Sequence, residues 1–169
     1  MKLALGTAQF GINYGVANLQ GQVSEEDAAD ILRLAASEGM NILDTAVAYG
    51  SAEEILGNIG VRGWNCITKI PPIPNDELCP KSWVEAQIRE SLKRLKLSHL
   101  SAVLLHQPSD ILGSKGKEYL AGLEEMKKQG FVSKVGYSIY SPEVLEELTD
   151  VFWPDVIQTP YNIFDQRIK

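Results

Sequence analysis

The sequence has little cysteine, and this scarcity excludes two classes to which a chain of this size could belong. Cys66 and Cys79 are the only cysteines among the 169 residues. Two are too few for the disulfide framework of a small secreted domain, and neither has the companion spacing of a metal site. We therefore predict no metal site, a buried Cys66 in an apolar strand and an exposed Cys79 after a proline-rich loop.

The sequence also lacks an excess of positive charge and a long apolar opening. Its formal net charge is −6 at pH 7, whereas non-specific nucleic-acid binding needs clustered Lys and Arg to neutralise phosphates. The opening segment Met1–Gly6 is too short an apolar run for a signal peptide. The hydrophobic content of 44% is that of a soluble globular protein rather than a disordered or membrane-spanning one. We expect a cytoplasmic protein without nucleic-acid or membrane partners.

Strand-like and helix-like patterns alternate along the whole chain, with no visible linker. Short apolar runs typical of strands occupy residues 3–7, 41–46, 64–69, 100–106, 131–138 and 155–159. Segments with helical spacing of apolar residues lie between them, at residues 25–38, 52–58, 82–95, 117–129 and 142–148. The regular alternation predicts a single domain that spans residues 1–169.

Local signals predict where three of the helices begin. Ser24 precedes three acidic residues and is expected to be an N-cap. Ser82, with Glu85 three residues later, has the spacing of a capping box. Ser141 is expected to cap a helix whose first position is proline. Residues 71–80 carry four prolines and are expected to form an extended loop, because each proline fixes its own backbone and restrains the residue before it.

The alternation of strands and helices predicts parallel strands joined by right-handed crossovers. A doubly wound sheet and a (β/α)8 TIM-type barrel both satisfy this pattern. Gly6, Gly11 and Gly15 do not match the glycine fingerprint of a doubly wound dinucleotide fold, so the barrel is favoured. A complete barrel needs at least about 200 residues. We therefore predict an incomplete α/β barrel of about five βα units plus a sixth strand, lacking strands seven and eight.

Each predicted strand ends in a hydrogen-bonding or ionisable side chain. Taken singly, each has an ordinary explanation: a lysine at a strand end is usually a solvated charge, and a histidine is usually a satisfied rim group. The carboxyl ends of parallel strands, however, share one rim, and barrel enzymes place their active sites there. Together these residues predict a site on that rim formed by Thr7, Asp44, Lys69, His106, Ser138 and Gln158.

The residues at these strand ends are similar to those of a known family. The matching elements are Asp44-Thr45-Ala46 with Tyr49-Gly50, then Thr68-Lys69, Leu105-His106, Gly136-Tyr137-Ser138, and Gln158 before Tyr161-Asn162. Together, from Leu3 to the C-terminus, they resemble the aldo-keto reductases, and the Asp-Thr-Ala-x-x-Tyr-Gly element is the most specific of them. The resemblance implies an oxidoreductase that reduces an aldehyde or ketone to an alcohol with a nicotinamide cofactor.

The resemblance also implies a catalytic set of Asp44, Tyr49, Lys69 and His106. Hydride delivery to a carbonyl carbon develops negative charge on the oxygen, so the site needs a proton donor there. Tyr49 takes this role in the resemblance. Tyrosine has an ordinary pKa of about 10, and a nearby Lys69 ammonium would favour the phenolate. Asp44 would hold Lys69 in place, and a neutral His106 would orient the carbonyl.

The cofactor implied by the resemblance is NADP, with NAD also left open. Ser138 and Gln158 would contact the nicotinamide carboxamide. Asp44 and Thr7 would lie near the nicotinamide ribose. The other ligand expected on this rim is a small-molecule carbonyl substrate.

Two positions depart from the pattern of the family. Ile139 stands where many relatives have an asparagine after the serine, and this removes one amide contact to the carboxamide. Ala8 stands where some relatives have a tryptophan. The pocket walls are therefore expected to come from Phe10, Tyr14 and residues 71–80, although loop packing is the ordinary reading of Phe10 and Tyr14.

Two other functions stay open on the sequence alone. A non-catalytic reductase-like binding module, or an inactive fragment, would bind without turnover, but it has no need to keep Tyr49, Lys69 and His106 together. A barrel aldolase would use Lys69 as a Schiff-base amine, but Asp44 at short range would keep that amine charged. In any of these cases the open edges of the first and sixth strands invite self-association.

Overall fold

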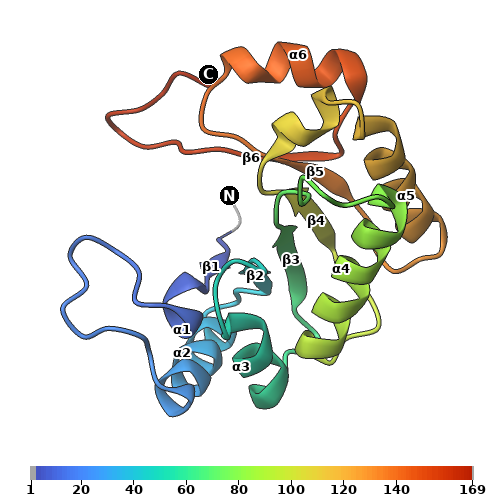
Figure 1. Ribbon diagram of the computed structural model, residues 1–169. Coiled ribbons are helices and arrows are strands. Elements are labelled where there is room, and N and C mark those ends of the chain that lie inside the picture. The colour runs from blue at the N-terminus through green and yellow to red at the C-terminus, as the bar shows by residue number, and fades with distance from the viewer. Residues whose placement is uncertain (1–2, 169) are drawn as a thin grey trace.

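The structure is a computed structural model that describes residues 3–168, and its strands form a curled, open half-barrel (Figure 1). All strands of this part of the chain are parallel and follow the sequence order from β1 to β6. The strands are β1 (Leu5–Gly6), β2 (Ile42–Asp44), β3 (Asn65–Ile70), β4 (Ala102–Leu105), β5 (Val135–Ser138) and β6 (Val156–Gln158). The predicted incomplete (β/α)8-type barrel is confirmed.

Helices follow the strands and cover the outer face of the sheet, as Figure 1 shows for α3, α4 and α5. They are α1 (Ala8–Gly11), α2 (Glu25–Ser37), α3 (Ala52–Ile59), α4 (Pro80–Leu95), the short 3-10 helix η1 (Pro108–Leu112), α5 (Gly116–Lys128) and α6 (Glu143–Val151). No helix within residues 3–168 is long and apolar enough to cross a membrane.

The register of the sheet aligns the carboxyl ends of its strands. Gly6 pairs with Asp44, Lys69 with Leu104, and Ser138 with Gln158 at the other end of the sheet. Strands β1 and β6 each pair with one neighbour among the described residues. Both edges are therefore open, as predicted.

Some local signals in the sequence are confirmed and others are wrong. Ser24 caps α2, because its side chain accepts the backbone N–H of Asp27. The capping box at Ser82 is wrong: α4 begins two residues earlier, at Pro80, since proline has no N–H to leave unpaired and its fixed backbone suits the first helical turn. Pro142, rather than Ser141, occupies the N-cap position of α6.

Two short helices were not predicted from the sequence, and most of the predicted strands are longer than the strands in the structure. Helices α1 and η1 lie in segments for which the sequence predicted no helix. The expected strand at residues 100–106 is reduced to four residues plus an isolated bridge between Leu100 and Val132. Apolar loop residues that stay buried, such as Leu100, extend the strand-like pattern beyond the regular ladder.

The hydrophobic core lies between the sheet and its outer helices. Leu43 and Leu105 on the strands are buried with Leu56 and Ile88 on the helices. A Cβ on Gly57 would lie 1.9 Å from a backbone oxygen at the end of α4, so α3 and α4 approach each other with no room for a side chain. The predicted burial of Cys66 and exposure of Cys79 are both confirmed.

A buried ion pair lies in this layer of helices. The side chain of Glu53, on the first turn of α3, accepts the hydroxyl of Thr68 at 2.6 Å and the Nε of Arg94 at 2.7 Å. The residue is 1% exposed. A buried carboxylate is tolerated only when it is paired and hydrogen-bonded, and both of its oxygens have donors here. The cluster joins α3, β3 and α4.

Replacing Thr68 with valine is expected to lower the free energy of unfolding by about 2 kcal/mol, because a buried carboxylate loses a hydrogen bond. Thr45→Val is the matched control: Thr45 is equally buried, and its hydroxyl has no hydrogen-bond partner among the described residues. That variant replaces an unpaired buried hydroxyl with a methyl group of similar size, so its free energy of unfolding is expected to stay the same or to rise. Urea unfolding of both variants measures the difference, and equal losses would contradict the assignment of the Thr68 bond.

Candidate active site

Three oxygen atoms surround the ammonium of Lys69 at the carboxyl end of β3. Its Nζ donates to Asp44 Oδ1 at 2.7 Å, to the carbonyl oxygen of Thr45 at 3.0 Å and to Tyr49 Oη at 3.2 Å. Lys69 is 2% exposed. An ammonium has three donors, so these three acceptors fill its hydrogen-bonding capacity. The structure thus brings together three of the predicted site residues.

Backbone hydrogen bonds fix the loop that carries Tyr49 over Lys69. The N–H of Thr45 donates to Ile67 and the N–H of Val47 donates to Lys69, so the chain leaving β2 stays paired with β3. A turn then returns the N–H of Tyr49 to Ala46. The phenol ring ends with its centroid 4.9 Å from the ammonium.

Glycine is required at two positions beside Tyr49. A Cβ on Gly11, at the end of α1, would lie 1.7 Å from the carbonyl oxygen of Tyr49. Gly50 has a φ of 56°, a left-handed backbone that glycine adopts without strain. The close contact holds the loop between α1 and β3, so the position of the phenol follows from the backbone.

His106 lies beside the phenol on the next strand end. Its ring and that of Tyr49 meet edge to face, with centroids 6.1 Å apart and planes at 85°. Burial, followed by the charge of Lys69, lowers the pKa of His106 below its ordinary value, and the Asp44 carboxylate opposes this effect. The imidazole is therefore neutral at pH 7 and offers one donor and one acceptor nitrogen.

The pKa of His106 is expected to respond in opposite directions to the two charges beside it. Lys69→Met removes a positive charge that disfavours imidazolium, so the pKa of His106 should rise. Asp44→Asn removes a negative charge that favours imidazolium, so it should fall below the wild-type value. A pH titration of the histidine ring signals by NMR measures both, and shifts of the same sign would contradict the geometry.

Asp44 is the centre to which two further predicted residues connect. The amide Nε2 of Gln158 donates to Asp44 Oδ1 at 3.0 Å. Thr7 is fully buried, and its hydroxyl donates to the carbonyl oxygen of Asp44 at 3.0 Å. Thr7 therefore supports the backbone of Asp44, and its expected place near a ribose stays a prediction.

Ser138 and Gln158 line a cleft between the ends of β5 and β6. The cleft has a volume of about 270 Å³. Ser138 is 7% exposed, and its hydroxyl has no partner among residues 3–168. The Oε1 atom of Gln158 is likewise free of any described donor, since its Nε2 is held by Asp44. A hydroxyl and an amide oxygen side by side can bind a ligand that carries both a donor and an acceptor.

Ile139 and Phe10 are both largely buried, and Ile139 also lines the cleft between β5 and β6. Both are 3% exposed and belong to the hydrophobic cluster. The expectation that Phe10 forms a pocket wall is therefore wrong, because the α1 turn carries its ring inward. Tyr14 is 58% exposed on the long loop before α2.

A second part of the rim was missed by the sequence reading. A cleft of about 260 Å³ lies beside His106, and Pro108, Tyr140 and Val144 contribute to its lining. Tyr140 is 70% exposed. An exposed aromatic residue two positions after a predicted site serine was the available signal. The proline-rich loop is tied to η1 nearby, since Asp110 accepts the backbone N–H of Ile73 at 2.8 Å.

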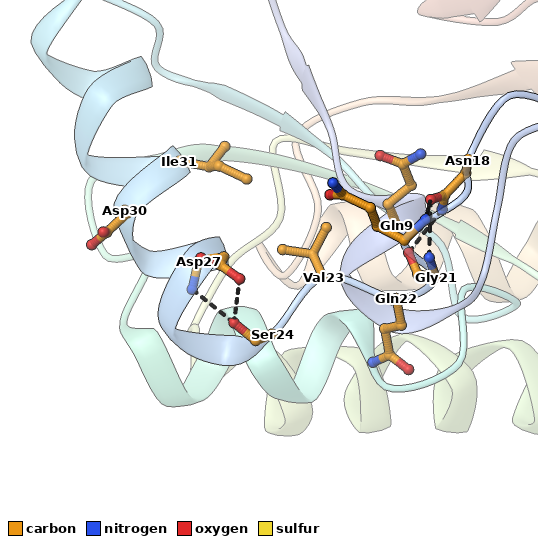
Figure 2. Close-up of a pocket in the computed structure, with 10 residues that line it drawn as sticks. Gln9, Asn18, Gly21, Gln22, Val23, Ser24, Asp27, Asp30 and Ile31 are labelled. Carbon is orange, nitrogen blue, oxygen red and sulfur yellow. Dashed lines mark hydrogen bonds between the residues drawn. The ribbon is translucent and has the colours of Figure 1, made fainter.

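A separate cavity of about 500 Å³ lies between the long loop and α2 (Figure 2). Its polar groups mainly hold the loop itself. Asn18 accepts the N–H groups of Gln20 and Gly21, and donates to carbonyl oxygens of Tyr14 and Gly21. The cavity is therefore a consequence of how the loop folds.

Comparisons with known proteins agree with this geometry. YhdN, an aldo-keto reductase of Bacillus subtilis, is 25% identical over 179 residues, covering 99% of this chain and 52% of its own length. The structure of PA4992 from Pseudomonas aeruginosa, described as an aldo-keto reductase, superimposes with a TM-score of 0.79 at 29% identity, covering 97% of this chain and 64% of that one. The Bombyx mori aldo-keto reductase AKR2E4, solved with NADP, gives a TM-score of 0.70 at 22% identity, covering 95% and 54%.

This chain spans about half the length of the curated relatives it matches. The match to a family is nonetheless continuous. Residues 2–169 match the sequence model of the aldo/keto reductase family. The Tyr49–Lys69–Asp44 cluster lies within that match, at the end of the half-barrel where the strands terminate. The chain belongs to the aldo/keto reductase family.

Proposed function

We propose that this polypeptide supplies the catalytic corner of an NAD(P)H-dependent reductase that converts an aldehyde or ketone to an alcohol. The observation that carries the proposal is the contact of 3.2 Å between Tyr49 Oη and Lys69 Nζ, with His106 beside the same phenol. A phenol, an ammonium and a neutral imidazole are the groups that a carbonyl oxygen needs as negative charge develops on it.

The phenol of Tyr49 is the proton donor in this proposal. Its Oη gives a proton to the carbonyl oxygen and takes one back from solvent afterwards. The phenolate that forms in between lies 3.2 Å from the Lys69 ammonium, and opposite charges at this distance stabilise each other. Asp44 keeps the ammonium in place from the other side at 2.7 Å.

His106 orients the substrate rather than protonating it. Because burial and Lys69 lower its pKa, the ring is neutral and one nitrogen donates a hydrogen bond to the carbonyl oxygen. With His106 as a second hydrogen-bond donor beside Tyr49, the carbonyl oxygen is held at a fixed position relative to Tyr49 Oη. Positioned donors of this kind contribute most when they are held before the reaction begins.

The carboxamide of a nicotinamide cofactor fits the cleft between β5 and β6. NADPH, when bound, supplies the hydride that reaches the carbonyl carbon. Ser138 offers its hydroxyl and Gln158 its free amide oxygen, which match the donor and acceptor of a carboxamide. We assign NADP as the cofactor on the basis of the Bombyx mori relative that was solved with it. NAD would satisfy the same carboxamide contacts.

The Schiff-base alternative needs a neutral, attacking amine at Lys69. The three oxygen acceptors around Nζ suit an ammonium instead, so this chemistry is not proposed.

The proposal is tested by following NADPH absorbance with a panel of small aldehydes and ketones. Continuous NADPH consumption that depends on the carbonyl compound is the expected result. Cofactor binding without any turnover, detected by quenching of tryptophan fluorescence, would instead support the non-catalytic binding module.

A further inference from the structure

The Glu53 cluster lies directly behind the Tyr49–Lys69 contact. Successive residues of a strand point to opposite faces of a sheet. On β3, Lys69 reaches Asp44 and Tyr49 inside the half-barrel, whereas Thr68 reaches Glu53 on α3. The two hydrogen-bonded sites therefore share one peptide unit.

Glu53 is also linked to Tyr49 through the start of α3. The carbonyl oxygen of Tyr49 accepts the N–H of Ala52, the first residue of that helix. Glu53 follows immediately and is held on its far side by Arg94, whose guanidinium lies 2.7 Å from its carboxylate. The loop carrying Tyr49 is thus joined to β3 at Lys69 through the N–H of Val47, and at Thr68 through Glu53.

We propose that Glu53 is a positioning residue, which holds the loop of Tyr49 against the strand of Lys69 so that phenol and ammonium stay in contact. The inference rests on the proposed function for its catalytic meaning, but its structural statement is independent of turnover. Glu53 reaches neither of these groups itself. It acts through Thr68 on one element and through the first turn of α3 on the other.

Both hydrogen bonds of Glu53 require a carboxylate at this position. Glu53 Oε2 accepts from Arg94, and Oε1 accepts from Thr68. An amide in place of the carboxylate would turn a donor toward one of these donors, so Glu53→Gln breaks the cluster without changing its size. Thr68→Val breaks only the bond to β3 and leaves the ion pair with Arg94 intact. Comparing the two variants therefore separates the effect of the Thr68–Glu53 hydrogen bond from that of the Glu53–Arg94 ion pair.

The test measures how often Lys69 becomes accessible, using acetic anhydride as the probe and mass spectrometry of the labelled chain as the readout. Lys69 is 2% exposed in the intact site. Loss of a hydrogen bond to a buried carboxylate is expected to raise its acetylation rate about tenfold in Thr68→Val. Glu53→Gln should raise it at least as much, and Thr68→Ser, which keeps the hydroxyl, should restore the wild-type rate.

Two internal comparisons separate positioning from general loosening. Cys66 is buried on the same strand, and burial and the nearby Glu53 charge both raise the pKa of its thiol. Because Thr68→Val keeps that charge, the rate of Cys66 alkylation in this variant reports opening of β3, and it is expected to stay unchanged. Thr149→Val removes a hydroxyl that bonds two carbonyl groups of α6, and it should leave Lys69 acetylation at the wild-type rate. An unchanged Lys69 rate in Thr68→Val would overturn the proposal, as would an equal rise at Cys66.

Turnover gives a second readout where the wild-type chain reduces a carbonyl compound. Thr68→Val is then expected to lower kcat about tenfold with KM for the carbonyl unchanged. A rise in KM at constant kcat would contradict a role in aligning Tyr49 with Lys69. Absence of hydride transfer in the wild type would end the proposed function, but the labelling result would still decide the role of Glu53.

Discussion

Tyr49→Phe is expected to lower kcat for carbonyl reduction by about 10²- to 10⁴-fold, the contribution of a positioned proton donor. The substitution removes a single oxygen, which lies 3.2 Å from Lys69 Nζ, and keeps the ring that packs against His106. Because Ser138 and Gln158 are untouched, the affinity for NADPH should stay near the wild-type value. Rates come from NADPH absorbance, and affinity comes from fluorescence titration.

Tyr119→Phe is the matched control for this loss. Tyr119 on α5 is 1% exposed and stacks on Trp83 of α4 in the outer layer of helices, so this variant removes a buried tyrosine hydroxyl without changing Tyr49, Lys69, Asp44 or His106. Turnover should be unaffected in that variant. If Tyr49→Phe retained wild-type kcat, another group would have to protonate the carbonyl oxygen, and the role given to Tyr49 would be wrong.

Lys69→Met is expected to have the second large effect, on both rate and stability. Loss of the ammonium beside the developing phenolate should lower kcat by about 10²- to 10³-fold. The same change leaves the Asp44 carboxylate with Gln158 as its remaining side-chain partner. Breaking a buried ion pair from one side costs about 3–5 kcal/mol. The lower end applies here, because the Asp44 side chain is 20% exposed.

A double-mutant cycle measures the coupling energy between Lys69 and Asp44 separately from the contribution of each residue alone. In Lys69→Met with Asp44→Asn, no charge remains unpaired at this position, so the double variant should be more stable than the sum of the two single losses predicts. The free energy of unfolding from urea denaturation gives each corner of the cycle. Simple additivity would mean that the 2.7 Å contact carries no coupling.

The positions of the site residues were predictable because the fold has one simple geometric consequence. In parallel strands every carboxyl end lies on the same side, so Asp44, Lys69, His106 and Gln158 meet although more than a hundred residues separate the first from the last. Short apolar runs and their terminal polar residues are local features of the sequence. The side on which they gather follows from strand direction alone.

Other features depend on contacts that local patterns do not encode. The partners Glu53 and Arg94 are 41 residues apart, and a single glutamate in an acidic first turn is usually a solvated charge. The inward turn of Phe10 depends on α1, a helix of four residues that is too short for a periodic signal. The start of α4 at Pro80 was misplaced because a serine two residues later matched a capping box equally well.

The most direct test of the central claim is transfer of deuterium to a simple aromatic aldehyde from NADPH that carries deuterium at both hydrogen positions of C4 of the nicotinamide ring. The account predicts one deuterium on the carbinol carbon of the alcohol formed by the wild-type chain, and a large loss of that product in Tyr49→Phe. The product is read by mass spectrometry and deuterium NMR. An alcohol without deuterium at that carbon, or no alcohol despite bound cofactor, would contradict the account.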